Sequence, residues 1–478
     1  MDAEKEMNLE ETGMIENALV EEDVDETPEF INPDDAVEVQ VDDDVPMEDD
    51  GEEEIGDMDF AEKEPVVDMS VTQLDSHQGP VYAVASFLDE TNDTSTLTII
   101  SGGGDDKAFL HKMNTGSTPT TVPLEYAHSD SVSCVALNLA YVSTDLSKTP
   151  RLAAVGAYDG AIVIYDPDTG AKLQNLEGPT DVEWICFHPK GGAVLLAGSA
   201  ADNTVWMFHV PMNKCLQVFV GHEAAVTAGA FSPDGKWALS ASTDGTVRVW
   251  APRTGQSKHV FRLGDDTGGA GLTCLATNGG SDGQLIIVGA EDGQAHVCHI
   301  GTKKVVASLR HYEIPTTTVA PAMDDDEDEM ELPMSVEAVG FAAPSVNPNW
   351  CATGGVDGQL KIWDLANGGQ CRQVCRLASL ERPAAEDGTH AISSMAGITR
   401  LQWHATQPWV FISTTEGSVH VWDARDGKLL RSLTGHTDVI NDLHVTFSDQ
   451  GRNAVIVSGS DDQSVRLFEV DSASVLQN

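Results

Sequence analysis

Basic residues are scarce in this sequence of 478 amino acids, which has 27 lysines and arginines against 77 aspartates and glutamates. Residues 1–68 hold 29 acidic residues and two lysines, and the other 410 residues hold 48 acidic and 25 basic ones. A phosphate backbone is held by clustered lysines and arginines. The net charge of −50 therefore disfavours direct binding to nucleic acid or to an anionic membrane surface, and it favours a basic protein partner.

Long apolar runs are also missing, since no stretch approaches the roughly 20 apolar residues of a membrane-spanning helix. The first residues, Met1 to Glu6, have neither the basic nor the apolar region of a signal peptide. The eight cysteines form no CxxC pair, so we expect no zinc site. These absences predict a protein of the cytosol or the nucleus with reduced, buried thiols.

Motifs for catalysis are absent as well. The sequence contains no P-loop, no GxGxxG before a helix, no GxSxG and no HExxH. The acidic run Asp324–Glu329 is contiguous, whereas a calcium loop alternates its ligands around a glycine. The sequence therefore predicts no enzyme, no cofactor and no metal site. The insertion at 324–331 is either a solvated loop or a docking element for a basic partner.

The composition changes near residue 68. Residues 1–68 contain acidic blocks such as Asp42–Asp44 and few aromatic side chains. Such a segment cannot bury enough apolar surface to offset the entropy that ordering costs. We therefore expect residues 1–68 to be a disordered acidic tail.

A repeated pattern fills the chain after residue 68. Eight times a β-type run leads to a turn with an acidic residue, and an aromatic residue usually follows six positions later. The acids lie 42 to 65 residues apart, and four short strands with their turns need about 40–45 residues. Each copy therefore predicts one blade of a propeller. The turn acids are Asp106, Asp159, Asp202, Asp244, Asp292, Asp357, Glu416 and Asp462.

Gly-His pairs precede several copies, as at Gly221-His222 and Gly435-His436. Together with the turn acids and the aromatic residues, they resemble the WD40 repeat family over residues 69–472. The resemblance implies an all-β fold, an eight-bladed propeller over 69–478 behind the acidic tail. It also implies a structural hydrogen-bond set made of His222, Ser242, Asp244 and Trp250.

The end of the chain predicts how the ring closes. The eighth copy ends at Phe468 and only ten residues follow, so it lacks an outer strand. The run Val71–Leu74, just before His77, has the matching pattern. We expect the segment at about 69–75 to complete the last blade and remove an edge that would otherwise invite aggregation.

In the WD40 family, three positions in each repeat point to the top of the ring. Of the 24 positions projected from this sequence, none is lysine or arginine and seven are acidic. Such a face suits an extended basic segment, whose aliphatic stems Tyr82, Tyr158 and Trp184 would cover. The alternative is a generally acidic surface without a specific partner. The seven acidic positions are Asp105, Asp181, Glu183, Glu291, Glu337, Asp438 and Asp461.

One stretch is more specific than the repeat pattern. Gly178-Pro179 replaces the usual Gly-His and leads into Asp181–Trp184. With the acidic tail and eight repeats, this stretch resembles the family of the angio-associated migratory cell protein, whose fungal branch is a ribosome-assembly chaperone. The resemblance implies a client, the tenth large-subunit ribosomal protein, captured by its basic N-terminal segment during synthesis. Charge alone implies only some basic client.

The sequence therefore predicts a monomeric, dedicated chaperone in biogenesis of the large ribosomal subunit. Two alternatives stay open. Histone tails are equally basic, so the protein could instead be a histone chaperone or chromatin scaffold. It could also be the substrate-recruiting WD40 subunit of a larger complex.

Overall fold

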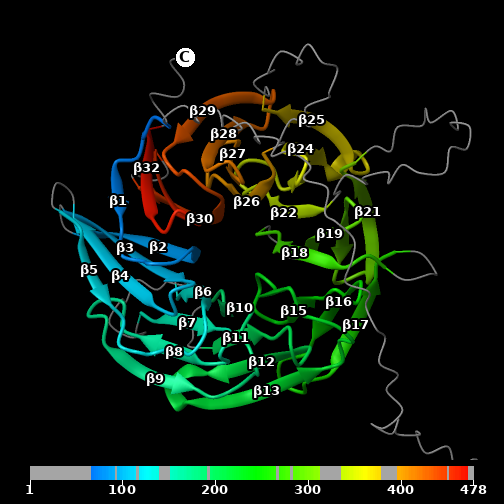
Figure 1. Cartoon of the computed structure of the whole chain (residues 1–478). Helices are drawn as coiled ribbons and strands as arrows, with labels where there is room; N and C mark the ends of the chain where they lie inside the picture. The colour runs from blue at the N-terminus through cyan, green and yellow to red at the C-terminus, as the bar shows by residue number, and fades with distance from the viewer. Residues whose placement is uncertain are drawn as a thin grey trace, which may run out of the picture. The chain divides into compact units, whose positions relative to one another are not determined.

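The computed structural model describes residues 66–471, apart from 92–93, 115–117, 139–150, 191–193, 265–268, 280–283, 313–334, 378–395 and 449–451. Residues 64–478 form one compact unit, in which eight sheets close a ring (Figure 1). The predicted acidic tail before residue 66 and the insertion at 324–331 lie outside the described residues. Among the described residues no helix is long and apolar enough to cross a membrane.

Each sheet is one blade of four antiparallel strands, and the first strand of each repeat lies nearest the ring centre (Figure 1). The prediction of an all-β, eight-bladed propeller is confirmed. The inner strands of blades one to eight are β2 (Val81–Thr91), β6 (Val132–Leu137), β10 (Trp184–Phe187), β14 (Ala228–Phe231), β18 (Leu272–Thr277), β22 (Val336–Phe341), β26 (Ile398–Trp403) and β30 (Ile440–Ser448).

The second strands read as continuous apolar runs because the neighbouring blades cover both of their faces. They are β3 (Thr94–Gly103), β7 (Ala153–Ala157), β11 (Val194–Gly198), β15 (Ala238–Ala241), β19 (Leu285–Ala290), β23 (Trp350–Gly355), β27 (Trp409–Thr414) and β31 (Asn453–Ser460). The third strands are β4 (Ala108–Asn114), β8 (Ile162–Tyr165), β12 (Thr204–His209), β16 (Thr246–Trp250), β20 (Gln294–His299), β24 (Gln359–Asp364), β28 (Ser418–Asp423) and β32 (Val465–Asp471).

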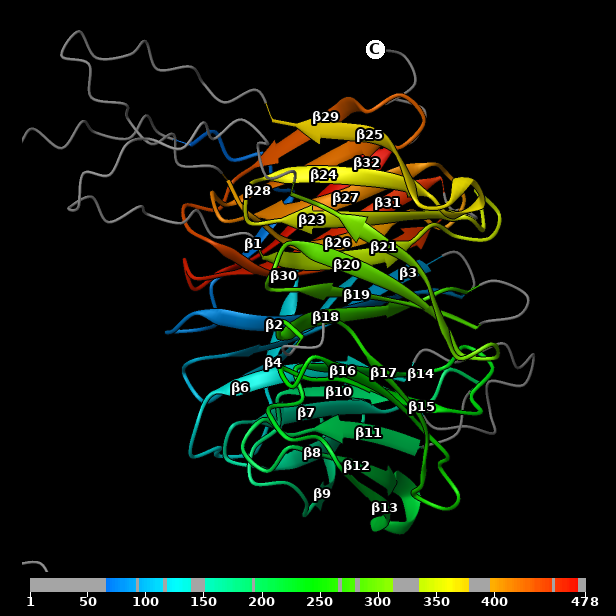
Figure 2. The same cartoon turned by 90° about the vertical axis from the view of Figure 1, so that its right-hand side faces the viewer.

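The outer strands are more exposed, because one of their edges and much of their surface face solvent. They are β5 (Thr120–Pro123), β9 (Lys172–Leu176), β13 (Lys214–Val220), β17 (Ser257–Arg262), β21 (Lys304–Arg310), β25 (Gln370–Arg376), β29 (Lys428–Thr434) and β1 (Thr72–Leu74). Short 3-10 helices precede two of them, η2 (Val210–Met212) and η3 (Leu365–Asn367). Figure 2 shows the ring from its side, with the strands running across its thickness.

The N-terminal strand β1 supplies the outer strand of blade eight. It pairs antiparallel with β32, with Leu74 opposite Val465, so the two ends of the ring are joined by ladder hydrogen bonds. Contacts of this segment begin at Val67, whose carbonyl accepts a hydrogen bond of 2.6 Å from the Thr434 hydroxyl. Asp68 forms an ion pair with Arg466. The closing contacts therefore start at residue 67, before the expected start at residue 69.

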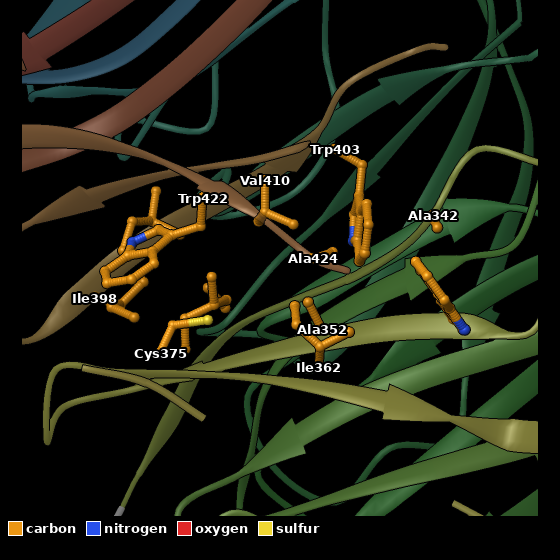
Figure 3. Close-up of a cluster of buried hydrophobic side chains, with 13 residues drawn as sticks. Ala342, Ala352, Ile362, Cys375, Ile398, Trp403, Val410, Trp422 and Ala424 are labelled. Carbon is orange, nitrogen blue, oxygen red and sulfur yellow. The ribbon is translucent and has the colours of Figure 1, made fainter. Parts of the chain in front are cut away.

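Apolar side chains fill the space between neighbouring blades. Between blades six and seven, Trp403 and Val410 pack with Ala352 and Ile362 in one buried cluster (Figure 3). The Trp403 indole N–H also donates to the Gly340 carbonyl across the blade boundary, at 3.2 Å. Burial of each such aliphatic or aromatic side chain contributes about 1.5–3 kcal/mol. Each blade therefore depends on its neighbours for its stability.

All eight cysteines are free, and they are buried or half-buried. Burial raises the pKa of the Cys134 and Cys186 thiols to about 12, so both stay protonated and unreactive at neutral pH.

The structural hydrogen-bond set of blade four contains a different serine from the expected one. His222 Nδ1 lies 2.8 Å from Asp244 Oδ2, and its Nε2 lies 2.7 Å from Ser240 Oγ. The Trp250 indole N–H donates to the same Ser240 Oγ at 2.8 Å. Ser240 therefore takes the place expected for Ser242 in the set, while the Ser242 hydroxyl accepts a hydrogen bond of 3.0 Å from the Asp244 N–H. Strand β15 ends at residue 241, so Ser242 already lies in the turn, out of reach of the indole.

The same set corrects the turn acid of blade one, which is Asp105 rather than Asp106. His77 Nδ1 lies 2.8 Å from Asp105 Oδ1, and His77 Nε2 lies 2.8 Å from Ser101 Oγ. His111 takes the place of the tryptophan, 3.0 Å from the same serine oxygen. Two consecutive aspartates after three glycines made this turn ambiguous in the sequence. Asp106 instead adopts a left-handed backbone, with a φ of 60°.

Candidate partner-binding site

The inner strands lie around the ring axis (Figure 1), and we call the end of the ring at which they start the mouth. In six blades the strand has a bulge there, as between Val81 and Ala83 and between Ile440 and Asp442. A bulge takes one residue out of the ladder and redirects its side chain. We call the eight residues at this position the mouth ring. They are Tyr82, Ser133, Glu183, Thr227, Thr273, Glu337, Thr399 and Asn441.

The turns that carry the turn acids lie beside the mouth ring. In blade two the backbone N–H of Tyr158, the residue before the turn acid, donates to the carbonyl of Ser131 at 3.0 Å. Glu291 N–H makes the same bond to Gly271, and Thr415 N–H bonds to Gly397, each at 2.9 Å. The structure thus brings the projected positions of a blade together at the mouth.

Five mouth-ring residues are short polar side chains that fasten one blade to the next. Thr227 and Thr399 each donate a hydrogen bond of 2.6 Å, to the carbonyls of Leu272 and Ile440 in the following blades. Asn441 bonds to Val81 at 3.1 Å and so connects the last blade to the first. Ser133 and Thr273 make the corresponding bonds to the carbonyls of Val182 and Val336.

In blade three a tryptophan takes over this connection. The Trp184 indole N–H donates to the carbonyl of Val226 in blade four, at 3.0 Å. The ring lies against Gly198 and Gly229, where an added Cβ would come within 2.2 Å and 2.0 Å of the indole. The Trp184 side chain is thus a half-buried wedge between two blades, and its contact with a partner stays a prediction. In blade three the hydrogen bond to the next blade is therefore made by Trp184 and not by the mouth-ring residue Glu183.

The position of Trp184 between two blades predicts that it contributes more to the stability of the fold than Tyr158 does. Trp184→Ala should lower the free energy of unfolding by about 3–5 kcal/mol, because it removes a packed indole and strands the Val226 carbonyl. Tyr158→Ala should change it by less than about 1 kcal/mol, since Tyr158 is 40% exposed. Chemical denaturation of both variants measures the difference. Equal losses for the two variants would contradict the wedge.

Glu183 is half-buried at the mouth. Burial, and after it the neighbouring Asp181 charge, raises the pKa of the Glu183 carboxyl, while Arg400 opposes this shift. Tyr158 lies near enough for its pKa to be raised to about 12 by burial and then by Glu183, with smaller effects of Tyr82 and Asp181. These four predicted residues, Tyr82, Tyr158, Asp181 and Glu183, therefore form one cluster over blades one to three.

The other acidic positions lie further round the ring. Glu337 is half-buried and accepts a hydrogen bond from the Ser335 hydroxyl. Glu291 is exposed and extends over Gly271, where an added Cβ would lie 2.7 Å from its carboxyl group. Asp461 accepts a hydrogen bond of 2.7 Å from the Asn441 amide. These side chains keep acceptor capacity for a cationic group.

Three of the predicted acids either make structural hydrogen bonds or lie away from the expected position. Asp105 is the turn acid described above, and its side chain is only 6% exposed, so it is unavailable to a partner. Asp181 accepts hydrogen bonds from Ser199 Oγ and from the backbone N–H groups of the turn at Ala200 and Ala201, so it contributes charge more than free acceptors. Asp438 is exposed but lies one residue before Val439, whose carbonyl accepts the hydrogen bond from the Asp461 N–H and which therefore corresponds to Ser131 of blade two.

The projection also missed a cation at the mouth. Arg400 follows the bulge residue Thr399, is 53% exposed, and its Nε lies 3.2 Å from Asp442 Oδ1. Asp442 also accepts a hydrogen bond of 2.9 Å from the Val84 N–H of blade one. The signal was present in the sequence, because the equivalent residues of the first six blades are apolar, whereas blades seven and eight have the charged pair Arg400 and Asp442 there. The mouth therefore contains carboxylates from several blades together with the guanidinium group of Arg400.

The chemistry available at the mouth is recognition of cations. Among the described residues no group of three or more histidine, cysteine or acidic side chains is placed to hold a metal ion. Half-buried carboxylates beside tyrosine rings can instead accept charge-assisted hydrogen bonds from lysine or arginine and contact their stems.

Comparison with known proteins agrees with this architecture. A family model described as "WD domain, G-beta repeat" matches residues 213–251, 335–364 and 427–469. The protein is thus a WD40-repeat propeller. The human angio-associated migratory cell protein is 34% identical over 393 residues, which cover 82% of this chain and 78% of that protein. The chain belongs to the family of the angio-associated migratory cell protein.

Two solved structures have the same ring. Sqt1 of Saccharomyces cerevisiae superposes with a TM-score of 0.65 at 17% identity and covers 84% of this chain and 99% of its own. Sqt1 of Chaetomium thermophilum, solved bound to the N-terminus of the ribosomal protein L10, has a TM-score of 0.63 at 20% identity and covers 84% and 100%. At these identities the likeness establishes the fold.

Proposed function

We propose that this protein is a chaperone for a basic ribosomal protein of the large subunit, and that it binds the client's N-terminal segment at the mouth ring. The observation that carries this proposal is the group of carboxylates at the mouth, with Glu183 and Glu337 half-buried. The likeness to Sqt1, one structure of which holds the N-terminus of L10, supports L10 as the client. The proposed mode of action is binding without a reaction or a cofactor, in the cytosol or nucleus, by a monomer.

Burial makes the Glu183 site receptive to a cation. A raised pKa means that the ionised carboxyl group is poorly stabilised in the free protein. A guanidinium that enters beside it restores this stabilisation and can pair with both carboxyl oxygens. The neighbouring Tyr82 and Tyr158 rings offer faces to the same cation or to its methylene groups.

The charge of the whole chain assists capture. A net charge of −50 attracts a basic segment from a distance and raises the rate of encounter at low salt. Bound carboxylates then serve as temporary counterions, which keep the client's lysines and arginines from RNA and from aggregation until the client is handed over.

An affinity pull-down from cell extract with the full-length chain tests the proposal. We expect one large-subunit ribosomal protein in near-stoichiometric amount, with recovery falling steeply as salt rises, because the contacts are ionic. The matched variants are Glu183→Arg/Glu337→Arg at the mouth and Glu125→Arg/Glu469→Arg at exposed positions elsewhere. Recovery of histones, or of ligase or kinase subunits, in place of a ribosomal protein would refute the proposal, as would equal recovery by both variants.

A further inference from the structure

Although the chain as a whole is acidic, one part of its surface carries mainly basic side chains. Residues 177–312, which span blades three to five, contain twelve acidic and ten basic residues. The acids lie mainly at the mouth end of the strands. Six of the ten bases lie at the other end, where the inner strand joins the second strand and the third strand joins the outer strand. We call this end of blades three to five the lower rim.

Six exposed cations lie in the lower-rim loops or at the first residue of the outer strand that follows. The loops that join the third and outer strands of the three blades contain no acidic residue. Among the described residues of the lower rim, Asp234 is the acid present, and it pairs with Lys236 at 2.8 Å. The cations of the lower rim are Lys190, Lys214, Lys236, Arg253, Lys303 and Lys304.

The loops form one continuous surface. His188 Nε2, two residues before Lys190, lies 3.1 Å from the carbonyl of Gly235, which precedes Lys236. The Gln217 side chain of β13 lies against Gly255 in the loop of blade four, where an added Cβ would come within 2.1 Å of its amide nitrogen. The backbone of Lys303 in blade five makes a hydrogen bond with His259 on β17.

At physiological salt, the electrostatic field of the lower-rim cations extends only a short distance. Strands of five to seven residues separate the lower rim from the mouth carboxylates, about 17–23 Å at 3.3 Å per residue. The Debye length at 0.15 M salt is about 8 Å, so these cations are largely screened from the acids at the far end. An anionic group that approaches the lower rim therefore meets a positive potential.

Apolar side chains interleave with these cations. Met212 is 70% exposed beside Lys214, Leu216 is 43% exposed on β13, and Val306 is 48% exposed on β21. Single-stranded RNA is usually held by exposed aromatic rings on which its bases stack. The tryptophan of these loops, Trp237, is instead packed against the core between blades four and five. Apolar contacts next to cations match a peptide better than a nucleic acid.

We propose that the lower rim of blades three to five is a second docking surface, which binds an acidic segment of a partner protein that also carries aliphatic side chains. Carboxylates of the segment pair with Lys214, Arg253 and Lys304, while its aliphatic residues cover Met212 and Leu216. The two ends of the ring then bind partners of opposite charge. This inference is independent of the function proposed for the mouth.

Fluorescence anisotropy with defined probes tests the lower rim. The probe is a fluorescein-labelled 15-residue peptide of repeated Glu-Glu-Leu, titrated with the full-length chain at 0.15 M salt. Lys214→Glu/Arg253→Glu/Lys304→Glu should weaken binding at least tenfold. The control variant Lys107→Glu/Arg262→Glu/Arg376→Glu changes the net charge equally at exposed positions away from the lower rim and should bind within twofold of the unmodified chain.

Two comparisons decide between partners. A repeated Glu-Glu-Ser peptide should bind at least threefold more weakly than the Glu-Glu-Leu peptide, because it lacks the aliphatic contacts. Oligouridylate RNA of equal charge should bind more weakly than both. Equal weakening by the lower-rim and control variants, equal binding of the two peptides, or tighter binding of the RNA would each overturn the proposal. Circular dichroism of both variants confirms that the ring is folded.

Discussion

Charge reversal of Glu183 and Glu337 together is expected to weaken binding of the L10 N-terminal segment at least a hundredfold. A hydrogen bond to a charged group contributes about 1.5–3 kcal/mol, and two lost bonds therefore remove about 3–6 kcal/mol. The introduced arginines would add repulsion of a basic client to this loss. Isothermal titration calorimetry at 0.15 M salt measures the change.

The control separates this effect from the total charge. Glu125→Arg/Glu469→Arg changes the net charge by the same amount at two exposed positions outside the mouth. It should weaken binding less than fivefold at 0.15 M salt, since distant exposed charges are screened. Equal losses for both double variants would place the client elsewhere and refute the mouth as its site.

Removal of the N-terminal strand is expected to open the ring. A chain that starts at Ser76 lacks β1, so Leu74, which is 5% exposed, no longer packs against blade eight. The loss includes the ladder to β32 and the Asp68–Arg466 pair. Loss of a buried leucine alone costs about 2–5 kcal/mol, and β32 becomes an exposed edge open to association. Thermal unfolding and size-exclusion chromatography should show a midpoint lowered by several degrees, with aggregation.

A chain that starts at Val66 is the matched control. It keeps the Val67, Asp68 and β1 contacts and should unfold at the temperature of the full chain. A stable, monomeric chain that starts at Ser76 would show that ring closure does not need β1.

Most of the fold could be predicted from the repeat pattern. Turn acids at a regular spacing and an aromatic six residues later depend on local backbone geometry, which every blade repeats. Closure by β1 followed from simple counting, because the eighth copy lacked one strand and the N-terminal run matched it. Degenerate copies were less informative. In blade one, Asp105 and Asp106 are equally suitable in the sequence, and only the contact with His77 selects Asp105.

The site was harder to predict than the fold. Glu183, Glu337, Glu291 and Asp461 lie at or beside the mouth as the projection expected, but Trp184 is a wedge between blades, which no local pattern reveals. Arg400 was missed because the projection selects Thr399, the residue before it, and the contact of Arg400 with Asp442 of blade eight is not visible within one repeat.

The sequence by itself determined the class of fold, the number of blades, the closing strand and the sign of the charge. These properties follow from composition and from patterns repeated within short stretches of chain. Only the tertiary structure decided which acids remain available to a partner, where Arg400 stands, and that the lower rim gathers cations in an acidic protein. The reason is physical: the environment of each of these side chains is made by residues from other blades, far away in the sequence.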